Sequence, residues 1–231
     1  METTIKFILI IILSYFAGSL PTAIVISKRL FGFDIREKGS GNMGSTNAFR
    51  VLGWKWGIVV QAIDILKGVL AVVVIGGILG EGIKFGNSIF SDIVIIKFIA
   101  GVVAVCGHIW SVFAGFKGGK GINVTIGLFL GIAPIDASIA IGIFIIVVLL
   151  SGYISLGSMF GAIALPSSMF IRFNLFGVNI PGYHILIYFV LGLAVLLVFT
   201  HRKNILRLAK GTENKFNKLQ LIKLKNTDNN I

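Results

Sequence analysis

Long apolar segments follow one another along nearly the whole chain, and they constrain its fold more than any other feature of the sequence. A helix needs about 20 predominantly apolar residues to cross the hydrocarbon core of a bilayer. Only 13% of the 231 residues are charged, whereas about a quarter are charged in a typical soluble domain. The sequence therefore predicts an all-α integral membrane protein, a polytopic bundle. The candidate spans are residues 5–27, 57–79, 93–115, 122–134, 136–151, 155–171 and 183–200.

The number of spans depends on how residues 122–151 are divided. This apolar stretch is too long for one comfortable helix, and Pro134 and Asp136 favour a turn within it. Dividing it gives seven transmembrane helices, whereas a tilted or re-entrant segment gives five or six. The first segment has neither a basic start nor a convincing cleavage site, so we interpret it as a retained span that continues through Pro21.

Basic residues are concentrated in one set of loops, and this asymmetry predicts the orientation. With seven spans these loops share one side, which the positive-inside rule makes cytoplasmic. The N-terminus is then outside and the C-terminus inside, and five spans would give the same result. The opposite loops carry only Lys84 and Arg172. The basic set comprises Lys28, Arg29, Arg36, Lys38, Arg50, Lys55, Lys117, Lys120, Arg202, Lys203, Arg207, Lys210, Lys215, Lys218, Lys223 and Lys225.

The remaining composition limits the partners. The formal net charge of +12 comes from basic residues that flank the apolar spans and orient the chain in the membrane. We therefore predict no nucleic-acid partner. We expect the basic cytoplasmic tail, residues 205–231, to be attracted to anionic membrane lipid. The single cysteine, Cys106, excludes disulfide and cysteine–metal frameworks. The nine carboxylates are scattered without a cluster suited to a metal, so we predict neither a metal nor a cofactor.

A glycine-rich loop between the first two spans has the composition of a phosphate-binding site. Glycine lets the backbone approach a ligand, consecutive N–H groups form a concave anion site, and an arginine supplies a bidentate fork. A helix that begins near Thr46 would add its N-terminal dipole. A flexible polar turn is the alternative. The candidate ligands are Ser40, Gly41, Asn42, Ser45, Thr46, Asn47 and Arg50.

Three shorter segments could join this loop. Residues 116–121 contain Gly118, Gly119 and Lys120 without the spacing of a Walker loop, and a simple positive-inside turn is the competing reading. His108, one helical stretch earlier, is either a packed histidine or a group that faces the site. The other two segments are Ser155 with Ser158, which could equally mediate helix packing, and His201 with Asn204, which could anchor the last span at the interface. All four fall on the same predicted side of the membrane, which favours one shared site.

These segments resemble, in order, the bacterial acyl-phosphate:glycerol-3-phosphate acyltransferases, the PlsY family. The resemblance extends from about Gly18 to Glu213. It departs from the family's pattern at Gly152, Ser111, Asn123–Val124 and Lys203. The residues that carry it are Gly18, Ser19, Pro21, Thr22, Asp34, Arg36, Gly39, Ser40, Gly41, Asn42, Gly44, Thr46, Asn47, Arg50, Gly53, Asp64, Lys67, Gly68, Gly107, His108, Phe116 to Gly121, Ser155, Leu156, Ser158, His201, Arg202, Asn204, Ile205, Arg207, Leu208, Gly211 and Glu213.

The resemblance implies a seven-helix acyltransferase domain over residues 1–204, in the inner (plasma) membrane with its active site facing the cytoplasm. Its reaction would move a fatty acyl group from acyl phosphate to the 1-hydroxyl of glycerol 3-phosphate, giving lysophosphatidic acid and phosphate. This is the first acylation step of phospholipid synthesis, and we expect a monomer to perform it.

Site residues also follow from the resemblance. Glycerol 3-phosphate would be held by Ser40, Arg50, Lys120, His201 and Asn204, of which all but Ser40 are assigned to catalysis. Acyl phosphate would meet Thr46, Ser158 and the glycine-rich loops, with Gly41, Asn42, Asn47, His108, Gly118 and Gly119 as further substrate-binding residues.

The chemistry allows two ways of activating the acceptor hydroxyl. No Ser-His-Asp arrangement is visible, so we favour a bound phosphate group that accepts the proton while His201 orients it. His201 as the general base is the close competitor. A transporter of a phosphorylated solute remains the alternative function, although the sequence shows no internal repeat.

Overall fold

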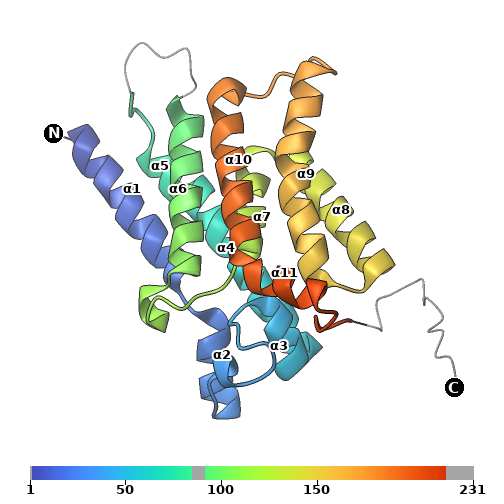
Figure 1. Cartoon of the computed structure of the whole chain (residues 1–231). Coiled ribbons are helices and arrows are strands. Elements are labelled where there is room, and N and C mark those ends of the chain that lie inside the picture. Colours follow the sequence, from blue (N-terminus) through green and yellow to red (C-terminus); the bar gives the residue numbers. More distant parts are fainter. Residues whose placement is uncertain (1, 85–91, 217–231) are drawn as a thin grey trace, which may run out of the picture.

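The computed structural model describes residues 2–84 and 92–216, and every regular element in these ranges is helical. Figure 1 shows the longer helices side by side, with some of the short helices below them. In chain order the elements are α1 (Glu2–Ser19), α2 (Thr22–Phe31), η1 (Ile35–Glu37), α3 (Ser45–Val51), α4 (Trp54–Val69), the π-helical η2 (Leu70–Gly76), α5 (Gly77–Leu79), α6 (Asp92–Ile109), η3 (Val112–Ala114), α7 (Ile122–Ile132), α8 (Pro134–Ser151), α9 (Ile154–Asn174), α10 (Tyr183–Thr200) and α11 (Arg202–Ala209). The all-α prediction is confirmed.

Six helical segments of the described chain are long and apolar enough to cross a membrane. They are Glu2–Phe31, Trp54–Leu79, Asp92–Ala114, Pro134–Ser151, Ile154–Asn174 and Tyr183–Thr200. The apolar helix α7 has 11 residues and is therefore about 16 Å long, roughly half of a bilayer core of about 30 Å. The predicted division of residues 122–151 is confirmed, because α7 ends at Ile132 and Pro134 opens α8.

The first span is interrupted where we expected it to continue. α1 ends at Ser19 and α2 begins at Thr22, because Pro21 lacks an N–H group and disfavours helical backbone at the residue before it. The carbonyls left free by this break find other donors. The Leu20 carbonyl accepts from Lys67 Nζ at 2.6 Å, and the Ser19 carbonyl accepts from Ser111 Oγ.

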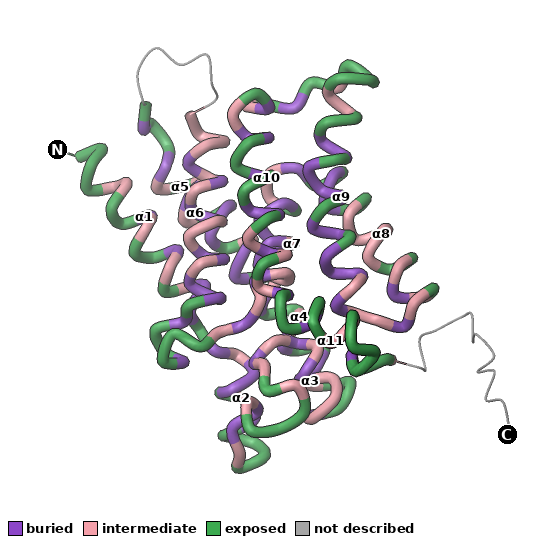
Figure 2. The backbone as a smooth tube through the Cα atoms, in the orientation of Figure 1, coloured by how far each residue is buried: buried purple, intermediate pink, exposed green. Residues whose placement is uncertain are grey.

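Apolar packing holds the bundle from within, and apolar side chains also cover its outside. In Figure 2 the buried positions lie along the inward faces of the helices, while much of α1 and α10 is exposed. Gly68 on α4 and Gly127 on α7 let these two helices touch, since a Cβ on either would lie about 2 Å from the other helix's backbone. The exposed outer side chains include Phe189, Val195 and Phe199. An apolar exterior over such helices is what a lipid environment requires.

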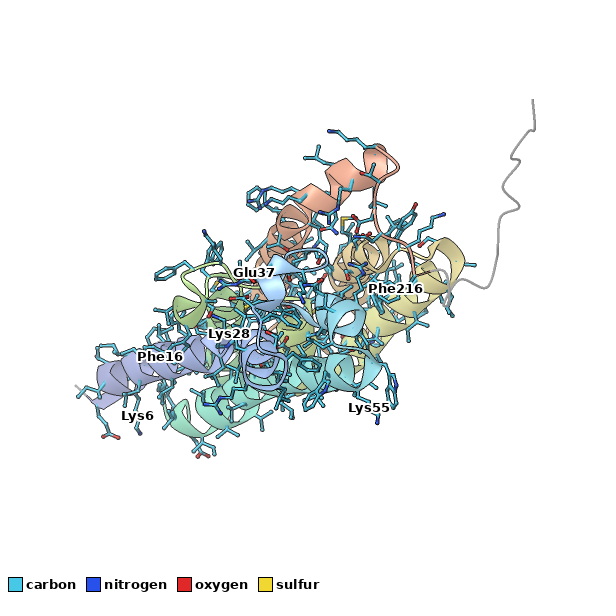
Figure 3. All side chains as sticks on the ribbon, turned by 90° about the horizontal axis from the view of Figure 1, so that it is seen from below. Lys6, Phe16, Lys28, Glu37, Lys55 and Phe216 are labelled. Carbon is cyan, nitrogen blue, oxygen red and sulfur yellow. The ribbon has the colours of Figure 1, made fainter. Side chains whose placement is uncertain are left out.

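The polar connections gather at one end of the bundle. α2, α3 and α11 lie at the lower end of Figure 1, together with the turn that joins α8 to α9. Figure 3 views this end directly and shows Phe216 next to the ribbons of α8 and α9. The four segments that the sequence predicted to share one side therefore do lie at the same end.

Candidate functional site: a polar rim above an apolar cavity

One cavity of about 640 Å³ opens among these polar connections and continues between α7, α8, α9 and α10. Its rim is polar and its depth is apolar. Of the predicted site residues, the following line it: Ser40, Asn42, Thr46, Asn47, Arg50, His108, Lys120, Ser158, His201 and Asn204. Gly41, Gly118 and Gly119 were also predicted to bind substrate, and they lie outside this lining.

The loop from Asp34 to Arg50 is shaped by the side chain of Asn47. Its Oδ1 accepts from the Ser40 amide at 2.8 Å, and its Nδ2 donates to the carbonyls of Ile35 and Lys38 at 3.1 and 3.0 Å. Asn47 is 1% exposed, so these bonds use its polar atoms within the protein. Gly39 has φ +64° and its missing Cβ would meet Asn47 Oδ1 at 2.3 Å, so the loop needs glycine there.

The start of the same loop is fixed by an ion pair. Asp34 caps η1 by accepting from the Arg36 amide, and its carboxylate also pairs with the Arg36 guanidinium at 2.8 Å. These bonds hold the pKa of Asp34 well below its usual range. The other nitrogen of the guanidinium donates to the Ala114 carbonyl, which ties this loop to the loop that follows α6.

Arg50 brings a positive charge from α3 to the rim. Its guanidinium lies 4.9 Å from the ring of Phe216 and donates to the Asn214 carbonyl at 3.5 Å. Burial lowers the pKa of Arg50, although the group stays charged at neutral pH. The Phe216 amide donates to the Gly152 carbonyl at 2.9 Å, so the segment after α11 crosses from Arg50 to the α8–α9 turn.

The second glycine loop folds back on the end of α6. The amides of Gly118 and Gly119 donate to the carbonyls of Ile109 and His108 at 3.0 Å, which leaves them turned away from the cavity. A Cβ on Gly119 would lie 2.0 Å from His108 Nε2, so only glycine fits against that ring. This arrangement leaves Lys120 as the loop's contribution to the rim.

Glu213 organises the rim, and sequence reasoning gave it no role. Its carboxylate accepts from Ser155 Oγ at 2.8 Å, Asn204 Nδ2 at 2.7 Å and Arg207 Nε at 2.6 Å. Burial raises the pKa of Glu213, but the hydrogen bonds from these three partners outweigh it and the net pKa is lowered. Glu213 is therefore ionised at neutral pH.

Asn204 connects Glu213 to Lys120 by hydrogen bonds. With its Nδ2 held by Glu213, the Oδ1 of Asn204 faces Lys120 and accepts from its ammonium group. Burial lowers the pKa of Lys120 to about 8, with Glu213 opposing the shift and Arg207 and Arg50 adding to it. Most Lys120 side chains are still cationic at pH 7. The network continues past residue 204, where we placed the end of the membrane domain, so the described residues up to Phe216 belong with the site.

His201 lies between α10 and α11 with one ring nitrogen already used. Its Nδ1 is 2.8 Å from the Leu197 carbonyl, which can only accept, so Nδ1 carries the proton and Nε2 is left as an acceptor. Burial, and then the charge of Lys120, lower the pKa of His201 to about 4. The ring is neutral at pH 7 and is a weak base.

A buried polar cluster lies beneath the rim. Asp64 accepts from Lys67 Nζ at 2.6 Å and from Thr22 Oγ1 at 3.3 Å, and the lysine also holds the break after α1. His108 is 4% exposed, with Nδ1 4.0 Å from Asp64 Oδ1. The His108 ring packs against Gly119 and also lines the cavity, and its role in binding substrate stays a prediction.

The depth of the cavity is lined by one face from each of four helices. The lining residues recur every three or four positions, as expected for one helix face. They are Ile122, Ile126 and Phe129 on α7, Ala137, Ala140, Ile141, Phe144, Ile145, Val148 and Leu149 on α8, Ile154, Gly161, Ala162 and Leu165 on α9, and Val190, Leu193, Ala194 and Leu197 on α10. A cationic rim above an apolar depth suits a ligand with an anionic head and an apolar tail.

Comparison with known proteins shows the family to which the chain belongs. Residues 8–211 match the family model described as glycerol-3-phosphate acyltransferase. The chain belongs to the glycerol-3-phosphate acyltransferase family. A protein of that name from Chlorobaculum tepidum is 44% identical over 226 residues, covering 91% of this chain and 97% of the relative. One from Chlorobium limicola is also 44% identical, covering 89% and 94%.

Solved structures give the same family. The chain matches the crystal structure of PlsY, an integral membrane glycerol 3-phosphate acyltransferase, in its glycerol 3-phosphate form, with a TM-score of 0.76, 31% identity and coverage of 91% of this chain and 95% of that one. The lysophosphatidic acid form of PlsY matches with a TM-score of 0.74 and 30% identity. The family predicted from the motifs is therefore confirmed, and the chain is a membrane enzyme of this family.

Proposed function

We propose that this acyltransferase moves a fatty acyl group from acyl phosphate to the 1-hydroxyl of glycerol 3-phosphate, releasing lysophosphatidic acid and phosphate. The observation that carries the proposal is a cavity in which a cationic rim opens into an apolar depth. A phosphorylated acceptor needs the cationic rim, and an acyl phosphate donor needs both the cationic rim and the apolar depth.

The two anionic head groups are assigned to different parts of the rim. Ser40, Arg50, Lys120, His201 and Asn204 hold glycerol 3-phosphate, because their loops converge on the cavity and Arg50 and Lys120 supply its charge. Thr46 and Ser158 face the acyl-phosphate head, above the apolar faces of α8, α9 and α10. The names of the PlsY structures, a glycerol 3-phosphate form and a lysophosphatidic acid form, support an acceptor and a product of this kind.

The reaction needs charge stabilisation and alignment more than it needs a strong protein base. The acceptor oxygen attacks the acyl carbonyl carbon, the bond from that carbon to the phosphate oxygen breaks, and phosphate leaves. Arg50 and Lys120 stabilise the negative charge that develops, and the fixed network around Glu213 holds Lys120 and Asn204 in place before the substrates arrive. We propose that the reaction proceeds without a metal ion or cofactor.

The acceptor proton goes to a phosphate group in this proposal. A base works best when its pKa is near the working pH, and the pKa of His201 is about 4. A phosphate monoester has its second pKa near 6, so it is a better acceptor at pH 7. His201 Nε2 orients the attacking hydroxyl, and the phosphate receives its proton.

We place the enzyme in the inner (plasma) membrane as a multi-pass protein with its rim in the cytoplasm. The N-terminus is outside and the C-terminus inside, with α7 as the short seventh span of a monomer. The support is the basic composition of the loops at the rim, namely Lys28, Arg29, Lys38, Arg50, Lys55, Lys117, Lys120, Arg202 and Lys203, because cytoplasmic loops are enriched in such residues.

A metal-free turnover assay tests the proposal. Purified protein is given palmitoyl phosphate and glycerol 3-phosphate in excess EDTA, and lysophosphatidate and phosphate are measured together. We expect both products in equal amounts. Palmitoyl-CoA or palmitoyl carrier protein, substituted for the acyl phosphate, should give none. If no product forms until a divalent metal is added, the metal-free reaction is wrong, and if vesicles take up glycerol 3-phosphate without product, the protein is a transporter.

A further inference from the structure

We propose that the blind end of the cavity sets the maximum length of the acyl chain, and that Ala137 is the residue that fixes this stop. The inference rests on the proposed function, because it takes the apolar depth as the acyl site. It adds a specificity-determining position on α8 that touches neither phosphate.

The depth of the cavity can be obtained from the lining residues of three helices, α8, α9 and α10. From the rim to the last lining residue, α8 runs from Leu149 to Ala137, α9 from Ser155 to Leu165, and α10 from His201 to Val190. At 1.5 Å per residue these stretches are about 18, 15 and 16 Å long. The three lengths agree to within about 3 Å.

This depth corresponds to a chain of defined length. An extended polypeptide advances about 3.5 Å for every three backbone bonds, or about 1.2 Å per bond, and an extended alkyl chain has a similar zigzag. A depth of about 15–18 Å therefore holds about 12–15 bonds. The upper limit matches a palmitoyl chain, which has fifteen carbon–carbon bonds.

The residues around Ala137 are buried, and Ala137 itself is 2% exposed. Phe129 and Leu165 line the cavity and are buried, and Met169, one helical turn further along α9, is fully buried. Asp136, the neighbour of Ala137, accepts from Ser168 Oγ at 2.7 Å and pairs with Arg172. Asp136 is 1% exposed, so this ion pair fixes α8 against α9 next to Ala137, and breaking it would be strongly unfavourable.

Ala137 and Ala140 offer a graded test of the stop. Both line the cavity with a single methyl group, so a larger side chain at either position shortens the depth. Ala140 is three residues nearer the rim, or about 4.5 Å, which equals about four bonds. The cutoff should therefore move further at Ala140 than at Ala137. Gly142 on the same helix is the matched control, because a Cβ there meets nothing within 4 Å and the residue is outside the cavity lining.

The experiment measures kcat/KM with palmitoyl, myristoyl, lauroyl and octanoyl phosphates in wild type, Ala137→Leu, Ala140→Leu and Gly142→Leu. We expect Ala137→Leu to lower the palmitoyl-to-lauroyl ratio at least tenfold, since one misfitting methylene can cost that much. Ala140→Leu should disfavour lauroyl phosphate as well. Octanoyl phosphate should be used by every variant within about threefold of wild type, which also shows that each one folds, and Gly142→Leu should keep the wild-type ratios.

The outcomes separate the inference from the proposed function. Equal losses for all four donors, or an unchanged ratio in both alanine variants, would overturn the chain-length stop while leaving the acyltransferase intact. Ala137→Val, a smaller change, should give an intermediate ratio, and it replaces Ala137→Leu if that variant does not fold. A wild-type protein that uses none of the four donors would overturn the proposed function itself.

Discussion

The rim and the depth of the cavity are built by different kinds of interaction. At the rim hydrogen bonds link polar side chains from different elements, as in the chain from Ser155 through Glu213 and Asn204 to Lys120. In the depth the side chains of α8, α9 and α10 are apolar and present only shape. Hydrogen bonds are directional and costly to leave unmade, whereas apolar burial depends on area and volume. Substitutions at the rim should therefore change rate, and substitutions in the depth should change which donor is preferred.

The largest effect should come from removing the cation of Lys120. Lys120→Met keeps the apolar stem, but it leaves Asn204 without its donor and the developing charge without its partner. We expect kcat/KM to fall about 100- to 1,000-fold, the usual cost of losing one charge-stabilising donor. In the wild type, kcat/KM for glycerol 3-phosphate should decline as the pH rises through 8, because the cationic form is lost above the pKa of about 8.

Lys117→Met is the matched control for that prediction. Lys117 belongs to the same loop and is exposed, outside the cavity lining, so its loss should leave kcat/KM within about twofold of wild type because surface charges contribute little. Equal losses in the two lysine variants would mean that the loop acts only as a membrane-facing charge.

The next effect should come from Glu213, which touches no substrate in our proposal. Glu213→Gln keeps the size of the side chain but removes the charge that holds Arg207 and Asn204. Each hydrogen bond to a charged group contributes about 1.5–3 kcal/mol, so we expect kcat to fall about 10- to 100-fold, with a smaller change in the KM for acyl phosphate.

Glu37→Gln, at an exposed carboxylate near the same end, is the control for Glu213 and should behave as wild type. A loss that falls entirely on the KM for glycerol 3-phosphate would instead place Glu213 next to the bound substrate.

A smaller effect separates the two proton acceptors. If His201 only orients the acceptor hydroxyl, His201→Gln should lower kcat about tenfold and keep the shape of the pH profile, whereas losing a general base costs about 100- to 10,000-fold. The pH–rate profile of both proteins is the measurement. Loss of nearly all rate at every pH would favour His201 as the base.

The smallest effect on activity should come from Asn47, whose bonds shape the loop from within. Asn47→Ala removes these three hydrogen bonds and leaves the Ser40 amide without the Asn47 acceptor, whereas the Ile35 and Lys38 carbonyls still accept from the Lys38 and Gly41 amides. We therefore expect about 1–3 kcal/mol less stability and a lower unfolding temperature. The KM for glycerol 3-phosphate should rise only severalfold. A large rise in KM with unchanged thermal stability would show that Asn47 binds substrate directly.

The sequence predicted the spans well because membrane helices carry long, unmistakable apolar runs. Pro134 correctly marked the end of α7. Pro21 did not mark the end of α1 for us, because apolar residues continue on both sides of it and only the proline itself signals the break. What stabilises that break, Lys67 in the next span, is visible only once the helices are packed.

The sequence predicted many of the residues that line the cavity, but not the hydrogen bonds that join them. Asn47 has the residue type of a ligand donor, yet its amide bonds to its own loop. Glu213 is a lone acid in a basic segment, and that was the available signal. Its partner Ser155 is 58 residues away in sequence, so no spacing rule connects them. Asn123, a departure from the family's pattern, donates to Ser45 Oγ at 2.9 Å and so supports the start of α3.

One comparison of donors tests most directly whether the rim and the depth act on the same substrate. Acetyl phosphate has the same reactive head as palmitoyl phosphate without the tail, so the two should be assayed with glycerol 3-phosphate in EDTA. Burial of each methylene contributes about 0.8 kcal/mol, so we expect kcat/KM to be at least about 100-fold higher for palmitoyl phosphate. Equal efficiency for the two donors would contradict a single cavity that binds head and tail together.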